Sequence, residues 1–286
     1  MTNASNLEVQ NGRIANDAQS LAMLKSRVGL IGFGAVGREV VRTFRAEGMP
    51  IEIIALARRV HADTDAVQWV RRTDELIALR PRLVIEAAGH GAVAEHVIAI
   101  LKAGIPVVLA SVGALADDAL RGQVTEAAQA GKTSLIFPSG AIGALDYIRA
   151  VSHSPNLRIR YCSRKPVAAW TKELTARGMS PERINCEITL FEGTARDAAL
   201  SFPQNLNVAM SLALAGPGIE GVEVRVVADP KATANTHEIE VESAAGKAAL
   251  IFNNRPSPGN PKTSALTALS IVCAVREHLD LQGTSR

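Results

Sequence analysis

Apolar positions in the first half of the chain form two alternating patterns. Short continuous apolar runs are typical of parallel strands buried on both faces, whereas apolar residues three or four positions apart indicate helices. Such alternation predicts a Rossmann-type doubly wound parallel sheet, the hallmark of an α/β protein. The expected strands are 27–32, 51–57, 83–88, 105–110 and 134–137, and the expected helices are 35–47, the segment around 93–101, and 117–130.

The pattern changes after about residue 155. Apolar and polar residues alternate around Ile159, from 184 to 190, around Val224 and around Val241. This period of two indicates strands with one covered face, so we expect a largely antiparallel sheet in a second, α+β domain. A helix is expected at 207–215. A final helix at 263–279 has one apolar stripe, and we expect it to return and pack on the first domain.

A glycine-rich turn links the first expected strand to the first helix. Residues 32–37 read Gly-Phe-Gly-Ala-Val-Gly, a G-x-G-x-x-G motif in the strand–turn–helix context that a dinucleotide site requires. Gly32 permits the tight turn, Gly34 lets the backbone approach a pyrophosphate, and Gly37 allows close packing of helix and strand. Ala35 and Val36 contribute N–H groups at the positive end of the helix. An ordinary turn of a doubly wound fold is the alternative.

The end of the second expected strand bears on the choice between NAD and NADP. A strict NAD site has Asp or Glu there, but this strand ends Leu-Ala-Arg-Arg at 56–59, and Glu52 lies at its wrong end. Arg58 is a candidate to bind a 2′-phosphate, with a solvated surface arginine as the alternative. The expected cofactor is therefore NAD or NADP.

Three small, glycine-rich loops follow later strands of the same sheet, at 87–90, 110–114 and 138–143. Their backbones can approach a nicotinamide ring or ribose closely, and Ala88 and Gly89 are the expected contacts. His90 either touches substrate or cofactor, or simply begins the next helix.

Composition excludes several classes. Aromatic residues make up 3% of the chain and the net charge is +3 without a clustered basic face, which argues against nucleic-acid binding. No apolar run approaches the length of a membrane span. The three cysteines are widely spaced, so we expect no metal site and reduced, partly buried thiols in a cytoplasmic protein.

Several ordered motifs together are similar to those of one enzyme family. They are Ala-Ala-Gly-His at 87–90, Ser-Val-Gly-Ala-Leu at 111–115, Pro-Ser-Gly-Ala-Ile-Gly at 138–143, Arg-Lys-Pro at 164–166, Phe-Glu-Gly at 191–193, Phe-Pro-Gln-Asn-Leu-Asn-Val-Ala at 202–209, Ala-Asp-Pro at 228–230, Asn-Thr-His at 235–237 and Asn-Pro-Lys-Thr-Ser at 260–264. From about residue 28 to 278 the chain resembles the L-aspartate dehydrogenase family.

The resemblance implies oxidation of L-aspartate with NAD(P) to iminoaspartate. That product either hydrolyses to oxaloacetate and ammonia or feeds NAD biosynthesis. It also implies that Ala141 and Asn207 contact the cofactor, that His237 is the active-site residue, and that the protein is a homodimer. Asn207 also opens an expected helix, so a purely structural cap is its alternative role.

The residues themselves agree on His237. It shares strand parity with Ile239 and Val241, so its side chain is expected on the covered face. A core histidine with a satisfied ring is the alternative, but imidazole also suits proton transfer near neutral pH.

A dicarboxylate substrate requires cationic groups or strong donors. Lys165, Lys262, Thr263 and Ser264 are the candidates, with solvated lysines and a Thr263 helix cap as alternatives.

The expected organisation has three parts. Residues 1–26 form a flexible N-terminal extension with one helical turn near 18–24. Residues 27–141 together with 255–286 form the dinucleotide-binding domain, and 142–254 form the catalytic and dimerisation domain. Two other functions stay open: a related reductase acting on another dicarboxylate, and a non-catalytic dinucleotide sensor.

Overall fold

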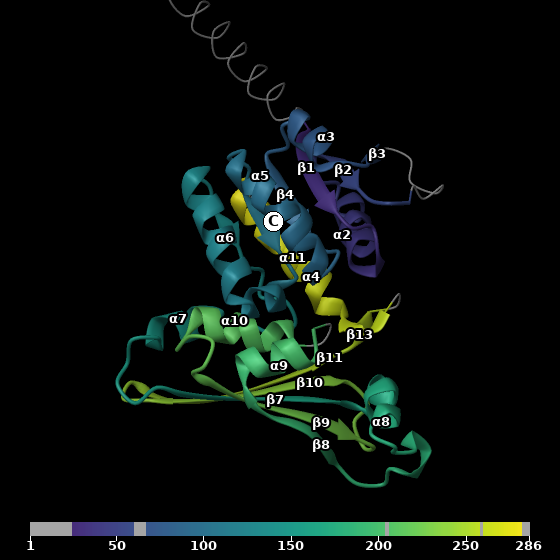
Figure 1. Ribbon diagram of the computed structural model, residues 1–286, viewed down its shortest axis with the longest axis vertical. Helices are drawn as coiled ribbons and strands as arrows, with labels where there is room; N and C mark the ends of the chain where they lie inside the picture. The colour runs from purple at the N-terminus through teal and green to yellow at the C-terminus, as the bar shows by residue number, and fades with distance from the viewer. Residues whose placement is uncertain (1–24, 60–66, 204–205, 258–259, 282–286) are drawn as a thin grey trace, which may run out of the picture.

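The computed structural model describes residues 25–59, 67–203, 206–257 and 260–281, with no side chains described for 260–262 (Figure 1). The helical turn expected near 18–24 lies outside these residues. Figure 1 shows a parallel sheet with its helices at one end of the molecule and a second sheet at the other. Helices α7 (Leu145–Val151), α9 (Ala195–Ser201) and α10 (Asn207–Ala215) lie between the two.

The first sheet has the doubly wound topology that the sequence predicts. Its order is β3-β2-β1-β4-β5-β6 and every pairing is parallel. The central strands are almost wholly buried because helices cover both faces. The strands are β1 (Ser26–Ile31), β2 (Ile51–Leu56), β3 (Val67–Val70), β4 (Leu83–Glu86), β5 (Val107–Leu109) and β6 (Leu135–Ile136).

The helices of this part follow the predicted periodicity. The main ones are α2 (Ala35–Ala46) and α6 (Asp118–Ala130). The helix expected around 93–101 is a continuous run of α4 (His90–Ala92), a π-helical turn η1 (Val93–Val97) and α5 (Ile98–Lys102). A 3-10 helix, η2 (Val112–Ala116), follows β5. Strand β3 and helix α3 (Thr73–Ala78) were not expected, because segments of four and six residues are too short to show a clear period.

The second sheet is mixed, with order β11-β10-β7-β9-β8. Its pairings are antiparallel except that of β7 with β9, which is parallel. The period of two is borne out, since the alternate residues Ile159, Tyr161 and Ser163 of β7 are buried. The strands are β7 (Arg158–Pro166), β8 (Ile188–Thr194), β9 (Val222–Asp229), β10 (Asn235–Ser243) and β11 (Gly246–Asn254).

Several details of the second half differ from expectation, including helices α7, α8 (Thr171–Ala176) and α9, which were not expected. The alternation that begins at Ile184 overstates the strand, because Ile184 follows a 3-10 turn, η4 (Pro181–Arg183), and β8 begins only at Ile188. Strand β11 was not expected. Strand β13 (Asn260–Ser264), which pairs with the short β12 (Pro256–Ser257), ends within the start of the expected last helix. A 3-10 turn, η3 (Val167–Trp170), leads into α8 (Thr171–Ala176) after β7.

The last helix, α11 (Ala265–His278), packs on the first sheet as expected. Its residues Ile271, Val272 and Val275 share one hydrophobic cluster with Leu30 of β1 and Phe44 of α2. At its end, Arg276 forms an ion pair with Glu47. The chain therefore leaves the first part, builds the second sheet and returns. The division at residues 141 and 254 into separate domains stays a proposal.

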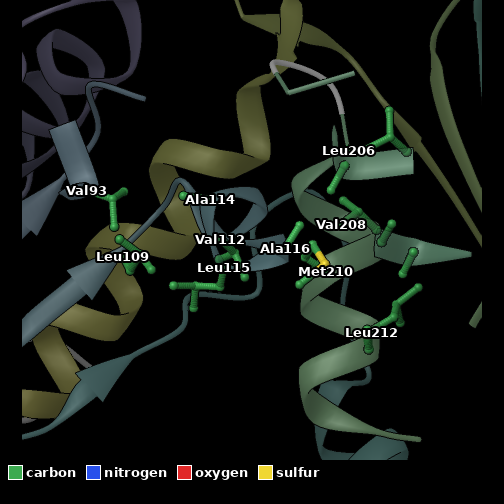
Figure 2. Close-up of a cluster of buried hydrophobic side chains, with 14 of the residues drawn as sticks. Val93, Leu109, Val112, Ala114, Leu115, Ala116, Leu206, Val208, Met210 and Leu212 are labelled. Atoms are coloured by element: carbon green, nitrogen blue, oxygen red, sulfur yellow. The ribbon is translucent and has the colours of Figure 1, made fainter. Parts of the chain in front are cut away.

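A second hydrophobic cluster is continuous between the two parts. Figure 2 shows Val112, Leu115 and Ala116 of η2 facing Val208 and Met210 of α10. These side chains are at most 6% exposed. Because this contact is apolar and closely packed, it fixes the position of α10 against the loop that follows β5.

Candidate active site

A cavity of about 140 Å³ lies at the carboxyl edge of the first sheet, between the two parts of the molecule. Open parallel sheets bind ligands at this edge. The predicted residues that line the cavity are Val36, Ala141, Lys165, Asn207, His237, Thr263 and Ser264. It is also lined by polar residues that were not predicted as site residues, namely Ser111, Ser139, Ser211, Asn235 and Thr267.

The glycine-rich turn has the geometry predicted for it. Gly32 has a φ of +89°, and a Cβ there would lie 2.6 Å from the Cβ of Ala88. A Cβ on Gly37 would lie 2.3 Å from the carbonyl oxygen of Gly32, so only glycine allows this packing of α2 on β1. A Cβ on Gly34 meets nothing within 4 Å.

The start of α2 is left open to an anion. Gly34 is the N-cap, no side chain caps the helix, and its first turn, which begins with Ala35, carries no acidic residue. The free N–H groups and the positive helix end therefore fit the pyrophosphate of a dinucleotide.

Glu86, which the sequence analysis missed, organises the adjacent loops. It ends β4 and is completely buried. Its carboxylate accepts hydrogen bonds from the N–H groups of Ala88, Gly89 and Ser111 and from the Ser111 hydroxyl, at 2.8–3.0 Å. Burial raises the pKa of Glu86, and these four hydrogen bonds act against that shift. An acidic residue at the end of an otherwise apolar strand is the signal that could have revealed it.

Because Ala88 and Gly89 direct their N–H groups to Glu86, any contact of theirs with a cofactor uses other atoms. Ala88 lies against Gly32, at the base of the glycine-rich turn. Neither Ala88 nor Gly89 lines the cavity.

Asn207 connects the second part to the first. It is the first residue of α10, whose N-cap is Leu206, so the structural-cap alternative is wrong. Its side-chain oxygen instead accepts a hydrogen bond of 2.8 Å from the N–H of Gly113. His90 begins α4, and burial lowers its pKa, an effect that the nearby side-chain oxygen of Asn207 partly offsets. His90 does not line the cavity.

Ala141 is held from the other side. Its carbonyl oxygen accepts a hydrogen bond of 2.6 Å from the side-chain amide of Asn254, on β11. The preceding N–H, of Gly140, donates to the hydroxyl of Ser270 on α11 at 3.0 Å. The loop after β6 is therefore fixed by both the second sheet and the returning helix.

His237 lies on the buried face of β10 and is 3% exposed, as its parity predicts. The hydroxyl of Tyr161 lies 2.7 Å from its Nδ1. Burial, together with the positive charge of Lys165, lowers the pKa of His237 to about 3. The imidazole is therefore neutral near neutral pH and able to accept a proton.

Lys165 is a buried lysine at the cavity wall. It is 3% exposed, and its Nζ lies 5.2 Å from the ring centroid of Trp170. The indole N–H of Trp170 donates to the carbonyl of Val227 at 3.2 Å, which fixes the ring. The surface alternative for Lys165 is therefore wrong. Its strand parity with Ile159 and Tyr161 is the signal that separates it from a surface lysine.

The neighbouring Arg164 points to the other face of β7. It forms ion pairs with Glu187, with Asp229 at 3.1 Å and with Glu238 at 2.8 Å. These contacts join three strands and the segment before β8, so Arg164 supports the sheet rather than the cavity.

The segment before α11 contributes two hydroxyl groups. Ser264 is the N-cap of α11, where its Oγ accepts from the N–H of Leu266 at 3.2 Å, so Thr263 is not the cap. Both hydroxyl groups line the cavity. Lys262 lies on β13, and its side chain is outside the described part of the structure.

Arg58 lies beyond the end of β2, away from the cavity. Its side chain is 93% exposed and its guanidinium lies 3.6 Å from the carboxylate of Glu95. Glu52, at the start of the same strand, lies 3.8 Å from Arg27. Glu52 is therefore remote from the cofactor edge, as expected.

The described residues contain no group of three or more metal-ligating side chains. Within them, no helix is long and apolar enough to cross a membrane. The expectation of partly buried cysteines holds only for Cys162, since Cys186 and Cys273 are exposed free thiols.

Comparisons with known proteins agree with this geometry. Residues 146–278 match the family model described as aspartate dehydrogenase, C-terminal, and residues 32–138 match that of the homoserine dehydrogenase NAD binding domain. The L-aspartate dehydrogenase 2 of Bordetella bronchiseptica is 45% identical over 258 residues, which cover 88% of this chain and 97% of that protein. The chain belongs to the L-aspartate dehydrogenase family. The resemblance noted from its motifs is confirmed.

Further relatives and solved structures extend the comparison. The L-aspartate dehydrogenase of Ruegeria pomeroyi is 38% identical over 257 residues, which cover 88% of this chain and 92% of that protein. The crystal structure of aspartate dehydrogenase from Thermotoga maritima has a TM-score of 0.70 and 26% identity, covering 91% of this chain and 98% of that one. A homoserine dehydrogenase from a hyperthermophilic archaeon, in complex with NADPH, shares the fold with a TM-score of 0.55 and 13% identity.

Proposed function

We propose that this protein is an NAD(P)-dependent L-aspartate dehydrogenase, which oxidises L-aspartate reversibly to iminoaspartate. The observation that carries the proposal is the pairing of a buried imidazole, His237, with a buried ammonium, Lys165, in one cavity beside the glycine-rich turn. Membership of the L-aspartate dehydrogenase family supports the choice of substrate. Hydrolysis of iminoaspartate to oxaloacetate and ammonia follows in water.

The cofactor is proposed to extend from the start of α2 into the cavity. Gly34, Ala35, Val36 and Gly37 would hold the pyrophosphate through backbone N–H groups, and Gly32, whose own N–H donates to the carbonyl of Leu56, would provide the tight turn beneath it. When bound, the nicotinamide ring accepts the Cα hydrogen of the substrate with its two electrons. Ala141 and Asn207 line the cavity that would receive the ring and its ribose. Ala88 and Gly89 lie outside that lining and are proposed to contact the cofactor nearer the glycine-rich turn, where Ala88 packs against Gly32.

The substrate is proposed to lie between the basic and hydroxyl groups of the cavity. Lys165, with Thr263 and Ser264, receives a carboxylate, and Lys262 is a further candidate. His237 takes a proton from the substrate nitrogen, so that the nitrogen lone pair can form the C=N bond. Burial lowers the pKa of His237 most, and the positive charge of Lys165 adds to it; a carboxylate beside Lys165 offsets the second effect, so substrate binding makes this base stronger.

The identity of the nucleotide is a separate proposal. Arg58 lies at the strand end where a 2′-phosphate would lie, and no carboxylate ends that strand. We therefore propose that NADP is accepted as well as NAD. We further propose that iminoaspartate made here feeds NAD biosynthesis, and that the enzyme works in the cytoplasm.

The outer face of the second sheet is the proposed homodimer surface. Helices α7, α9 and α10 cover the other face (Figure 1). A shallow hollow of about 610 Å³ on the outer face is lined by alternating charges, including Arg160, Glu238 and Arg225. Opposite charges placed in this way can meet their complements across a two-fold axis. Sedimentation analysis of the wild type should give a dimer, and Arg160→Glu should shift it toward monomer.

The experiment that tests the function is an absorbance assay of NAD(P)H formation from L-aspartate at neutral to alkaline pH. Turnover with aspartate well above that with glutamate, alanine or homoserine supports the proposal. A preference for another dicarboxylate would favour the related reductase. Tight cofactor binding without turnover on any of these substrates would favour a dinucleotide sensor.

A further inference from the structure

The rings of His237 and Tyr161 lie side by side on the buried face of the second sheet. The register of β7 and β10 pairs His237 with Ser163 and Ile239 with Tyr161, so His237 and Tyr161 are diagonal neighbours. Their planes differ by 13° and their centroids are 6.0 Å apart. The phenol oxygen lies 2.7 Å from Nδ1. This contact occupies one of the two ring nitrogens of His237.

The hydrogen bond at one ring nitrogen decides what the other can do. A neutral imidazole has one N–H and one lone pair, and the partner of the first nitrogen fixes which form is present. With Nδ1 held by Tyr161, Nε2 is the nitrogen left for a ligand. A base in the cavity therefore needs the hydrogen on Nδ1 and the lone pair on Nε2.

We propose that Tyr161 is a positioning residue for His237: its hydroxyl accepts a hydrogen bond from Nδ1–H and leaves the Nε2 lone pair to take the proton of the substrate nitrogen. This inference deepens the proposed function and rests on it. When Nε2 is protonated, the same bond stabilises the imidazolium, because Nδ1–H continues to donate to the phenol oxygen.

The surroundings of Tyr161 suit an acceptor. The side chain is 1% exposed, and burial raises its pKa, which the nearby Ser163 hydroxyl partly offsets. The phenol therefore stays neutral throughout the working pH range. Ser163, two residues along the same face of β7, has a buried Oγ without a hydrogen-bond partner among the described residues. The Ser163 hydroxyl lies near the Tyr161 phenol. When Nδ1–H of His237 donates to the phenol oxygen, the phenol hydrogen must point away from Nδ1, and Ser163 is the nearby group toward which it can turn.

The charged groups around His237 are few. Among the described residues that line the cavity, Lys165 is the one Lys, Arg, Asp or Glu side chain, and its positive charge acts on His237 from β7. The residues contributed there by α10, β13 and α11 are uncharged within the described set. Changes in the titration of His237 can therefore be assigned to Tyr161 or Lys165.

The test compares Tyr161→Phe with Tyr147→Phe in the full-length protein. These are the two tyrosines of the chain, and Tyr147 lies on α7, outside the cavity lining. For Tyr161→Phe we expect kcat for L-aspartate to fall roughly 10- to 100-fold, with KM changed less than about twofold because no substrate contact is lost. The acid limb of the kcat profile should move to lower pH, since the imidazolium loses its acceptor. Tyr147→Phe should match the wild type.

A second readout does not depend on activity. With ¹⁵N-labelled histidine, the His237 signals, assigned by their absence in His237→Gln, should show the Nδ1–H form in the wild type and a mixture in Tyr161→Phe. A wild type with the Nε2–H form or a mixture would overturn the inference, even if Tyr161→Phe did not fold.

The outcomes separate the inference from the function on which it rests. Unchanged kcat in Tyr161→Phe, with His237→Gln inactive, would overturn the role of Tyr161 and leave the proposed function standing. Full activity in His237→Gln would overturn both the role of His237 and that of Tyr161.

Discussion

Glu86 accepts hydrogen bonds from both the backbone N–H and the hydroxyl of Ser111, at 2.9 and 3.0 Å. The same carboxylate accepts from the N–H groups of Ala88 and Gly89. One buried side chain therefore holds together the loops that follow β4 and β5, and both loops lie at the cofactor edge.

Glu86→Gln should loosen this edge. The NH₂ group of glutamine would face N–H donors that now bond to a carboxylate oxygen. Each buried N–H group left without an acceptor costs about 1–3 kcal/mol of stability. We expect a lower free energy of unfolding in urea and a higher KM for NAD(P). The control Glu126→Gln changes an exposed residue of α6 and should stay within about 0.5 kcal/mol of the wild type. Wild-type stability and KM in Glu86→Gln would show that the loops hold without this carboxylate.

Gly37→Ala and Gly34→Ala should separate packing from phosphate binding. A Cβ on Gly37 would clash with the Gly32 carbonyl, so the unfolding free energy should fall by about 1–3 kcal/mol. A Cβ on Gly34 has open space, so stability should be kept while the Kd for NAD(P) rises roughly tenfold, or about 1.4 kcal/mol. Calorimetric titration with each nucleotide measures this. Unchanged affinity in Gly34→Ala would place the phosphates elsewhere.

Lys165→Met should weaken substrate binding without affecting the cofactor. Loss of a buried cation opposite a carboxylate costs about 2–3 kcal/mol, equivalent to a roughly 100-fold rise in KM for L-aspartate. The Kd for NAD(P), measured by fluorescence titration, should not change. Lys172→Met, at an exposed position of α8, is the matched control. An equal effect of both substitutions would contradict a direct role for Lys165.

Arg58→Gln and Glu95→Gln should change the nucleotide preference in opposite directions. Arg58→Gln removes the proposed partner of the 2′-phosphate and should lower kcat/KM for NADP more than for NAD. Glu95→Gln removes a carboxylate 3.6 Å from that guanidinium and should raise kcat/KM for NADP roughly 2- to 5-fold, the scale of an exposed ion pair. If the ratio of kcat/KM for NADP to kcat/KM for NAD stays at the wild-type value in both variants, Arg58 is a solvated surface residue.

His237 should affect both catalysis and acid stability. His237→Ala should lower kcat roughly 10²–10⁴-fold if the ring is the acid–base group. Its pKa is lowered to about 3 in the folded protein, against 6.5 for the free side chain. The unfolded chain therefore binds the extra proton between those values, and the folded state loses stability as pH falls through this range, by at most about 1.4 kcal/mol per pH unit.

The contribution of His237 to the pH dependence of the unfolding free energy can be isolated with His237→Gln, because glutamine does not titrate. From pH 6.5 to 5, where most carboxylates are still ionised, urea unfolding of the wild type should lose stability faster than that of the variant. Parallel curves would show that His237 is not held neutral.

The sequence by itself determined the parallel sheet and much of the site. Continuous apolar runs are typical of strands buried on both faces. The spacing from Gly32 to Gly37 is recognisable because the close contacts that require glycine lie within one strand–turn–helix unit. Strand parity likewise placed His237 on a covered face, because a strand alternates its side chains whatever it pairs with. Short elements such as β3 lacked enough periods to be recognised.

Only the tertiary structure decided which distant groups meet. Asn207 reaches Gly113, and Asn254 reaches the Ala141 carbonyl, across more than ninety residues of chain. Glu86 and Ser111 meet because their strands are neighbours in the sheet, and Tyr161 meets His237 because of the register of β7 and β10. Such contacts depend on strand order and register, which follow from packing of the whole core and leave no local pattern in the sequence.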